Sequence, residues 1–373
     1  MESNQTPKHR QIFQALRNAI SSGEYPPGSR LPSEAELGKT FSASRITLTR
    51  ALRDLQTAGL IERRVGSGSY VRNVVPSGMT FGLLIPQLGQ TEIFEPICSG
   101  MTTAGGSNHM LIWGRSLQDQ DAIEDQAMEL CGQLIAKRVS GVFFAPIEYT
   151  ANRREVNRRI VASFTAASIP VVLLDRDFVP YPQRSPLDLI GIDNRRAGHT
   201  VTAHLLAQGC RRLLFVGLPD AAETVDARIS GFREAVSRSA PNAVGHVTRI
   251  DSSDIAAVRK ALDQFRPDGI VCANDVAAAN MMRTLGALGI EVPDAIRLVG
   301  HDDVRYANLL PVPLTTIHQP CSQMGEMAMR VMLLRLAEPH VPPRDVLLNF
   351  SLVVRQSCGA QRRETSRGTN GTQ

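Results

Sequence analysis

Residues 45–53 (RITLTRALR) carry arginine and threonine at spacings that suit contacts to DNA base edges. Wound as an α-helix at about 100° per residue, the stretch has an apolar stripe and an opposite face. The stripe holds Leu48, Ala51, Leu52 and Leu55, and the other face holds Ile46, Thr49, Arg50 and Arg53, with Arg45 at the N-terminal edge. Guanidinium groups can bond guanine, and methyl groups can contact thymine. The pattern predicts a helix that reads the major groove; a hairpin used for protein contacts is the alternative.

Two further helices are expected to position this one. Residues 7–22 carry apolar side chains at helical spacing. Ser33 is expected to cap a second helix, with Glu36 completing a capping box, and Ser44 is expected to cap the third helix, residues 45–58. The N-terminus of the second helix could hold a DNA phosphate through its free N–H groups.

A short hairpin follows the third helix. Ile61–Val65 and Ser69–Arg72 predict two strands joined by Gly66, Ser67 and Gly68, and Arg64 lies beside this tip. The glycines allow a tight turn to approach a DNA backbone closely. Residues 1–72 are therefore predicted to form a winged helix-turn-helix domain.

The charge of the chain is concentrated in the same region. The formal net charge is +5, and residues 1–75 hold 11 Lys or Arg against 6 acids, so they carry all of it. A basic small domain on a neutral large one is typical of a nucleic-acid-binding protein. A solvated basic surface is the alternative that charge alone leaves open.

Cysteine usage and the N-terminus indicate the compartment. The six cysteines are scattered without metal-site spacing, and most lie in apolar stretches, so we expect buried free thiols in a reducing cytosol. The N-terminal residues lack the apolar core of a signal peptide, and no segment approaches the length of a membrane span. We expect a cytoplasmic protein with no membrane partner, no metal and no cofactor.

From Met79 the pattern changes to apolar strands that alternate with helices such as 119–137 and 195–208. The strand candidates are Phe81–Ile85, Met110–Trp113, Gly141–Ala145, Pro170–Leu174, Leu189–Ile192, Arg212–Val216, Gly269–Cys272 and Arg297–Val299. This alternation predicts an α/β fold with doubly wound parallel sheets in two lobes. We assign 73–78 to a linker, 79–360 to this domain and 361–373 to a disordered tail.

Residues 7–72 resemble the DNA-binding domain of the GntR family through SSGEYPPGSRLPSEAEL and SASRITLTRALRDLQTAGLIERRVGSGSYV. The resemblance implies DNA contacts by Arg45, Thr47, Thr49 and Gly66. The family often has arginine where this chain has Ala35 and Thr49, so the operator sequence does not transfer. The candidate DNA-binding residues are Ser33, Ser44, Arg45, Thr47, Thr49, Arg50, Arg53, Arg64, Gly66, Ser67 and Gly68.

Residues 80–359 resemble the effector domain of the LacI/GalR family, which is similar to periplasmic sugar-binding proteins. The segments that carry the resemblance occur in the family's order and include IPVVLLDRDF, LIGIDNRRAGHTVTAHLLAQGCRRLLFVG, DARISGFREA, DGIVCANDVAA and LVGHDDV. The resemblance implies two parallel-sheet lobes with a ligand cleft between them, and side-by-side homodimers.

The same resemblance carries the family's ligand contacts to Arg228, Asn274 and Asp302, and a further cleft position to Asp175. Such side chains at strand and loop ends can together bond adjacent hydroxyl groups. Each has another interpretation. Asn274 could cap a helix, Asp302 could belong to a turn, and Arg228 could form a surface ion pair.

Two departures concern the aromatic rings that stack on the ligand. Ser252 stands where the family commonly has an aromatic residue, and His301 stands where it often has Phe or Tyr. Trp113, at the end of a predicted strand, is expected near the cleft. Three other aromatic residues are candidates for the missing stacking face: Phe94, Phe178 and Tyr306. A polar effector is expected.

Together these features predict a ligand-responsive DNA-binding transcriptional regulator that represses carbohydrate-utilisation genes. A sugar-like effector would control its affinity for a palindromic double-stranded operator that two protomers bind. A regulator that responds to a nucleoside or another small polar metabolite, as co-repressor or activator, is the alternative.

Two other classes fit less well. An enzyme is not expected, because the sequence has no GxSxG, no Walker loop, no GxGxxG after a strand and no zinc motif. A transport receptor would suit the neutral domain alone. The basic N-terminal region and the missing signal peptide favour the regulator.

Overall fold

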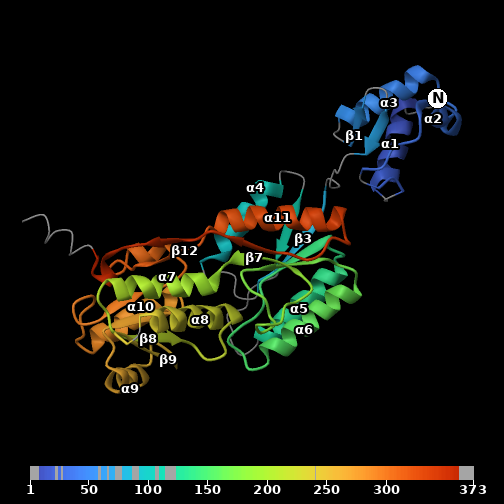
Figure 1. Ribbon diagram of the computed structural model, residues 1–373. Coiled ribbons are helices and arrows are strands. Elements are labelled where there is room, and N and C mark those ends of the chain that lie inside the picture. Colours follow the sequence, from blue (N-terminus) through green and yellow to red (C-terminus); the bar gives the residue numbers. More distant parts are fainter. Residues whose placement is uncertain are drawn as a thin grey trace, which may run out of the picture. The chain divides into compact units, whose positions relative to one another are not determined.

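The computed structural model describes residues 8–21, 24–26, 28–57, 60–64, 67–71, 78–85, 92–105, 109–113, 123–239 and 241–360. The chain divides into two units between Gly78 and Met79, and each has its own core (Figure 1). The linker predicted at 73–78 lies outside the described residues except for Gly78, and the tail predicted at 361–373 lies outside them entirely.

The small unit is a helix-turn-helix followed by a wing. Its elements are α1 (Lys8–Ser21), α2 (Glu34–Phe41), α3 (Arg45–Thr57), β1 (Ile61–Arg64) and β2 (Gly68–Val71). The two strands pair antiparallel, from Ile61 opposite Val71 to Arg64 opposite Gly68. Apolar side chains from all three helices and both strands form one core: Ile12, Leu16, Leu37, Leu48, Leu52, Leu55, Ile61 and Val71. The predicted winged helix-turn-helix is confirmed.

The first lobe of the large unit is built on a six-stranded parallel sheet in the order β13-β7-β6-β5-β3-β4. Its strands are β3 (Thr80–Leu84), β4 (Met110–Trp113), β5 (Gly141–Phe144), β6 (Val171–Leu174), β7 (Asp188–Ile192) and β13 (Asp345–Leu348). One face is covered by α4 (Phe94–Gly105) and α11 (Cys321–Ala337), and the other by α5 (Ile123–Ala136) and α6 (Arg153–Ala166) (Figure 1).

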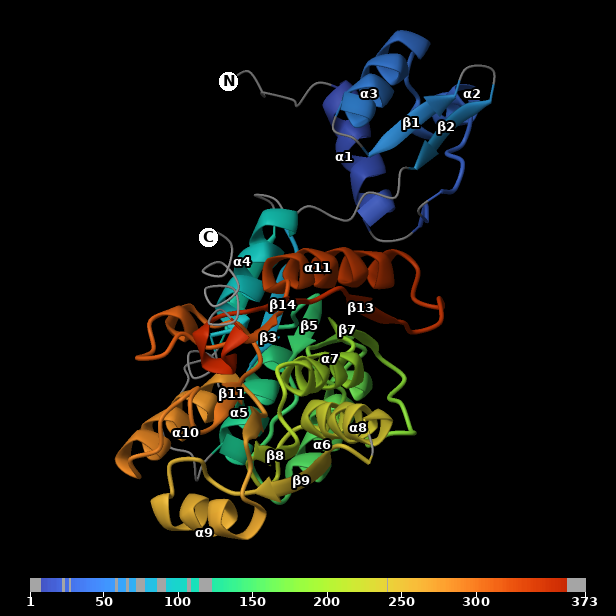
Figure 2. The ribbon, with the colours of Figure 1, turned by 60° about the vertical axis from the view of Figure 1, so that its left-hand side comes forward.

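The second lobe is built on a four-stranded parallel sheet in the order β11-β10-β8-β9. Its strands are β8 (Arg212–Gly217), β9 (Val244–Arg249), β10 (Gly269–Cys272) and β11 (Arg297–Val299). One face is covered by α7 (Asn194–Ala207) and α8 (Glu223–Arg238), and the other by α9 (Ile255–Phe265) and α10 (Asp275–Ala287) (Figure 2). The chain crosses between the lobes after β7, after β12 (Thr316–His318) and before β14 (Ser351–Val353).

The α/β, two-lobed fold predicted from the sequence is confirmed, and every predicted strand is present within two residues at either end. Four strands were not predicted: β9, β12, β13 and β14. The helix predicted at 119–137 is described from Ile123 to Ala136. All six cysteines are free and five are buried, as predicted. Within the described ranges, the structure contains no helix with the length and apolar character needed to cross a membrane.

Candidate nucleic-acid interface and ligand cleft

Helix α3 has the two faces that its sequence predicts. Leu48, Ala51, Leu52 and Leu55 are buried. On the outer face, Ile46 is 84% exposed and the side chain of Arg45 is 91% exposed. Arg50 and Arg53 are exposed, and Thr47 and Thr49 are half-buried. This face offers guanidinium donors and apolar methyl groups of the kinds that read base edges in a major groove.

Glu34, at the start of α2, connects this face to the wing, and the sequence analysis missed it. Its carboxylate accepts a hydrogen bond from Arg63 of β1. It also lies 3.5 Å from the Thr49 hydroxyl oxygen and 3.8 Å from Arg45 Nε. The acid therefore orients donors from two other elements. Its only sequence signal is its place in the first turn of a helix, where the backbone dipole favours a negative charge.

Two predicted DNA-binding side chains cap helices. Ser33 Oγ accepts from Glu36 N at 3.3 Å. The Glu36 carboxylate accepts from Ser33 Oγ at 2.8 Å and from Ser33 N at 2.7 Å, and these two bonds lower the pKa of Glu36. Ser44 Oγ accepts from Thr47 N at 3.3 Å and lies 2.9 Å from Thr47 Oγ1. The predicted caps are confirmed. A phosphate at this end of α2 would meet backbone N–H groups rather than the Ser33 hydroxyl.

In the described part of the wing, two side chains contact Tyr70. The guanidinium carbon of Arg64 lies 4.6 Å from the centre of its ring, and Ser67 Oγ lies 2.8 Å from its hydroxyl. Gly68 has φ +120°, and a Cβ there would lie 2.8 Å from a guanidinium nitrogen, so only glycine fits without strain. Gly66, the predicted wing-tip contact, lies outside the described residues.

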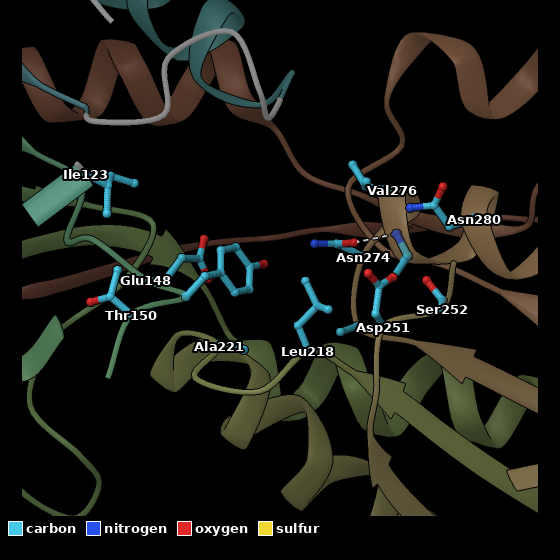
Figure 3. A pocket seen from close by; sticks show the side chains of 13 residues that line it. Ile123, Glu148, Thr150, Leu218, Ala221, Asp251, Ser252, Asn274, Val276 and Asn280 are labelled. Carbon is cyan, nitrogen blue, oxygen red and sulfur yellow. Dashed lines mark hydrogen bonds between the residues drawn. The ribbon is translucent and has the colours of Figure 1, made fainter. Parts of the chain in front are cut away.

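In the large unit, loop and helix residues that follow the carboxyl ends of strands in both lobes line a cavity of ≈ 230 Å³ (Figure 3). The first lobe contributes Ile123, Glu148, Tyr149 and Thr150. The second contributes Leu218, Ala221, Asp251, Ser252, Ala273, Asn274, Val276, Ala277 and Asn280. The carboxyl edge of a parallel sheet is where open α/β folds bind ligands.

The charge of this lining is one-sided. Among the lining residues that the structure describes, the charged ones are the acids Glu148 and Asp251, and none is Lys or Arg. Hydroxyl and amide groups come from Ser252, Asn274 and Asn280, and the rest is mostly apolar. The described residues hold no group of three or more His, Cys, Asp or Glu side chains placed to bind a metal ion.

A buried ion-pair cluster lies behind the cavity in the first lobe. Arg176 Nη1 lies 2.8 Å from Glu148 Oε1 and 3.3 Å from Asp175 Oδ2, and Arg176 Nε donates to a backbone carbonyl at 2.9 Å. Burial disfavours the charged guanidinium, but Glu148 and Asp175 outweigh it and raise the pKa of Arg176. The cluster places Asp175 at 4% exposure, deep in the lobe.

The second lobe contributes a matching buried group. Arg228 Nε donates to Asn194 Oδ1 at 2.8 Å, and its Nη1 donates to the Ala273 carbonyl at 2.6 Å. Asp302 Oδ1 accepts from Gln319 Nε2 at 2.7 Å. Arg228 is 6% exposed, so the alternative of a surface ion pair is wrong.

Two acceptors near this cluster have no partner among the described residues: Asp175 Oδ1 and Gln319 Oε1 are buried without a hydrogen bond. An unpaired buried acceptor is costly, so these atoms suit a ligand that donates hydrogen bonds, such as one with several hydroxyl groups. Gln319 was not a predicted site residue.

Burial controls ionisation in the second lobe's part of the cluster. It raises the pKa of Asp302 to about 7, against the opposing effect of Arg228. It also lowers the pKa of His301 well below the ordinary value, so His301 is neutral. Asp302 therefore titrates near neutral pH, where a ligand's hydroxyl groups would meet either an acid or a carboxylate.

The predicted ligand residues are thus divided between the cavity and the cluster. Asn274 lines the cavity, and its Oδ1 caps α10 by accepting from Ala277 N at 2.8 Å, so the cap is confirmed and the ligand contact stays a prediction. Asp302 has φ +114°, as in a turn. Asp175, Arg228 and Asp302 lie outside the cavity lining.

The aromatic side chains are placed differently from the expectation. Phe94 is 1% exposed, and the centre of its ring lies 5.7 Å from the guanidinium carbon of Arg176. Phe178 packs in the core of the first lobe. Neither lines the cavity, because burying these rings stabilises the lobe instead. Tyr306 packs against the second lobe's core, and Trp113 is 63% exposed outside the lining. The ring that does line the cavity, Tyr149, was not predicted.

Comparison with known families places both parts of the chain. Residues 8–71 match the family model of bacterial regulatory proteins of the gntR family, and residues 202–358 match that of a periplasmic binding protein-like domain. The two-domain resemblance predicted from the sequence is confirmed.

Curated relatives that match this chain are transcriptional repressors. The arabinose metabolism transcriptional repressor of Geobacillus stearothermophilus is 26% identical over 372 residues, covering 96% of this chain and 99% of that protein. The ribose operon repressor of Escherichia coli K12 is 28% identical over 230 residues, covering 60% and 67%. A solved LacI-family regulator from Enterococcus faecium with bound ribose has a TM-score of 0.60 at 21% identity, covering 74% of this chain and 98% of its own, and it shares the fold.

Proposed function

We propose that this chain, which joins a GntR-family DNA-binding domain to a periplasmic-binding-protein-like domain, is a ligand-responsive transcriptional repressor of carbohydrate-utilisation genes. The observation that carries the proposal is that one chain holds both an exposed helix of base-reading side chains and a two-lobed cleft. The repressor relatives that span the full chain support the same assignment.

The DNA target follows from α3. Its outer face, with Arg45 and Ile46, enters the major groove, and the remaining predicted residues on α3 and the wing contact bases or phosphates at the edges. Two protomers bind a palindromic operator, since a symmetric dimer presents two recognition helices. The excess of positive charge in residues 1–75 supplies the attraction to phosphate.

The effector is a neutral, hydroxyl-rich molecule of the sugar type. Among the described lining residues the charged side chains are the acids Glu148 and Asp251, and these carboxylates disfavour sugar phosphates and sugar acids. The hydroxyl and amide groups of Ser252, Asn274 and Asn280 in the same lining favour a ligand that carries hydroxyl groups. The effector acts by biasing the lobes toward closure, which changes the affinity of the DNA-binding domains for the operator.

A nucleoside is the second candidate. The Tyr149 ring and the apolar side chains of Ile123, Leu218 and Val276 also line the cavity, and apolar and aromatic surface of this kind would suit the planar base of a nucleoside.

Thermal melts of the full chain with pentoses, hexoses, sugar acids, sugar phosphates and nucleosides test this assignment. A ligand at about 100 times its dissociation constant adds roughly 2.7 kcal/mol of stability. We expect stabilisation by a neutral sugar and none by its phosphate or acid. Selection of duplexes from a random pool with the same protein tests the DNA assignment, and no enriched palindrome would contradict it.

A further inference from the structure

Two segments from different lobes contact each other beside the cavity. The first, residues 148–154, follows β5 in the first lobe, and the second, residues 218–223, follows β8 in the second lobe. Arg153 Nη1 lies 2.9 Å from Asp220 Oδ1. Arg154 contacts Glu223 Oε1 through two nitrogens, at 3.0 Å from Nε and 2.8 Å from Nη2.

Main-chain groups join the same two segments. Tyr149 N donates to the Asp220 carbonyl at 2.8 Å, and Ala222 N donates to Glu148 Oε2 at 3.1 Å. The other oxygen of Glu148 belongs to the buried ion pair with Arg176. One carboxylate that is 3% exposed therefore binds a cation of its own lobe and an amide of the other lobe.

These contacts form one wall of the cavity. Glu148, Tyr149, Leu218 and Ala221 are lining residues of the cavity (Figure 3). The lobes cannot part on this side without breaking both ion pairs and both main-chain hydrogen bonds. None of these contacts needs a ligand atom.

We propose that residues 148–154 and 218–223 form an interlobe latch that holds the cleft closed in the absence of effector, so that the strength of the latch sets how much closure the effector can add. The latch rests on the proposed function only for the identity of the ligand. Closure of the cleft can itself be measured without any ligand. A ligand gains apparent affinity in proportion to the population of the conformation that binds it, so a weaker latch lowers effector affinity.

The latch has outer ion pairs that are exposed to solvent and an inner contact that is buried. In the outer pairs one partner is well exposed: the side chains of Asp220 and Arg154 are 48% and 44% exposed. Salt weakens such pairs as the screening length falls from about 10 Å at 0.1 M to about 3 Å at 1 M. The hydrogen bond from Ala222 N to the Glu148 carboxylate is buried, so added salt affects it much less. Opening is therefore favoured by salt through the outer pairs.

Charge reversal tests the latch in the full chain. Spin labels on Gln133→Cys and Lys260→Cys, exposed positions on α5 and α9, report the interlobe distance by pulsed electron paramagnetic resonance. Cys98→Ala removes the one cysteine that is not buried. We expect Arg154→Glu to raise the open population roughly three- to tenfold, the double variant Arg154→Glu/Glu223→Arg to restore closure, and salt to open the unmodified latch.

Arg158→Glu is the matched control, because Arg158 is also on α6 but lies near Glu155 of the same helix, 3.7 Å away. It should leave the distance distribution unchanged. An unchanged distribution in Arg154→Glu, or no recovery in the double variant, would overturn the latch. Because these readings need no effector, a failed ligand screen would count against the proposed function and not against the latch.

Discussion

Arg45 is the side chain from which we expect the largest single contribution to base recognition. It is almost fully exposed at the N-terminal end of α3, with only a 3.8 Å approach to Glu34. Arg45→Ala should weaken binding to a selected operator by about 1–3 kcal/mol and relax specificity at one base pair. Fluorescence anisotropy with single-base operator variants measures both effects. Arg17→Ala, an exposed arginine on α1, is the charge-matched control. Equal losses in the two variants would show a purely electrostatic role.

Asp302 makes the large unit's stability depend on pH in a defined direction. Its pKa is raised by burial from 3.8 to about 7, so between these values the folded protein holds a proton that the unfolded chain releases. The contribution of Asp302 to stability therefore falls as pH rises through this range. The Tm of the protein relative to Asp302→Asn should be lower at about pH 7.5 than at about pH 5. Calorimetry measures this difference, and parallel pH profiles would contradict the shift.

At the scale of elements, the α7–α8 contact holds Arg228 in place. A Cβ on Gly231 of α8 would meet the Arg195 carbonyl oxygen at 1.9 Å, and one on Gly198 of α7 would meet the Arg228 carbonyl oxygen at 2.2 Å. Gly231→Ala must push the helices apart and should destabilise the large unit by about 1–3 kcal/mol or more. Denaturant unfolding of the full chain measures this loss.

Gly286→Ala is the control for that change. Gly286 lies on α10 of the same lobe, and its Cβ would meet nothing within 4 Å. Alanine there should be neutral or stabilise the helix by about 0.5–1 kcal/mol, since it removes the conformational freedom of glycine in the unfolded chain. Similar destabilisation by both substitutions would show that helix approach is not the cause.

Local patterns predicted the elements whose signals are local. The sequence predicted the capped helices α2 and α3 and the apolar strands β5 and β6. In these elements the capping residues or the spacing of apolar side chains agree with the side chains that the structure buries. β9 (VGHVTR) was missed because it is a half-exposed edge strand without an apolar run. β13 pairs with β7 across more than 150 residues of chain, a register that no local pattern specifies.

At the scale of the whole molecule, the resemblance predicted Arg228, Asn274 and Asp302, but not how the structure distributes them. Tyr149 and Glu148 went unnoticed because their roles depend on the segment from the other lobe that faces them. Glu34 went unnoticed for a similar reason, since its partners lie on α3 and the wing. Residues whose roles arise only from tertiary neighbours carry no periodicity or motif of their own.

Arg228 should separate sensing from DNA binding. It is buried in the second lobe and makes no contribution to the core of the small unit, which is formed by residues 12–71. Removing its charged donor should weaken effector binding roughly 10- to 100-fold. Arg228→Ala should therefore lose the effector's thermal stabilisation and its change in operator affinity, while binding the operator normally without effector.

Titration of operator DNA with and without the effector found in the melting screen measures both properties of Arg228→Ala. Arg238→Ala is the control, because Arg238 is an exposed arginine on the same helix, paired with Glu234 at 2.7 Å. It should respond as the unmodified protein does. A normal effector response in Arg228→Ala would place the effector elsewhere in the molecule. A loss of operator binding without effector would mean that the sensor fold, and not only its ligand, is required for DNA recognition.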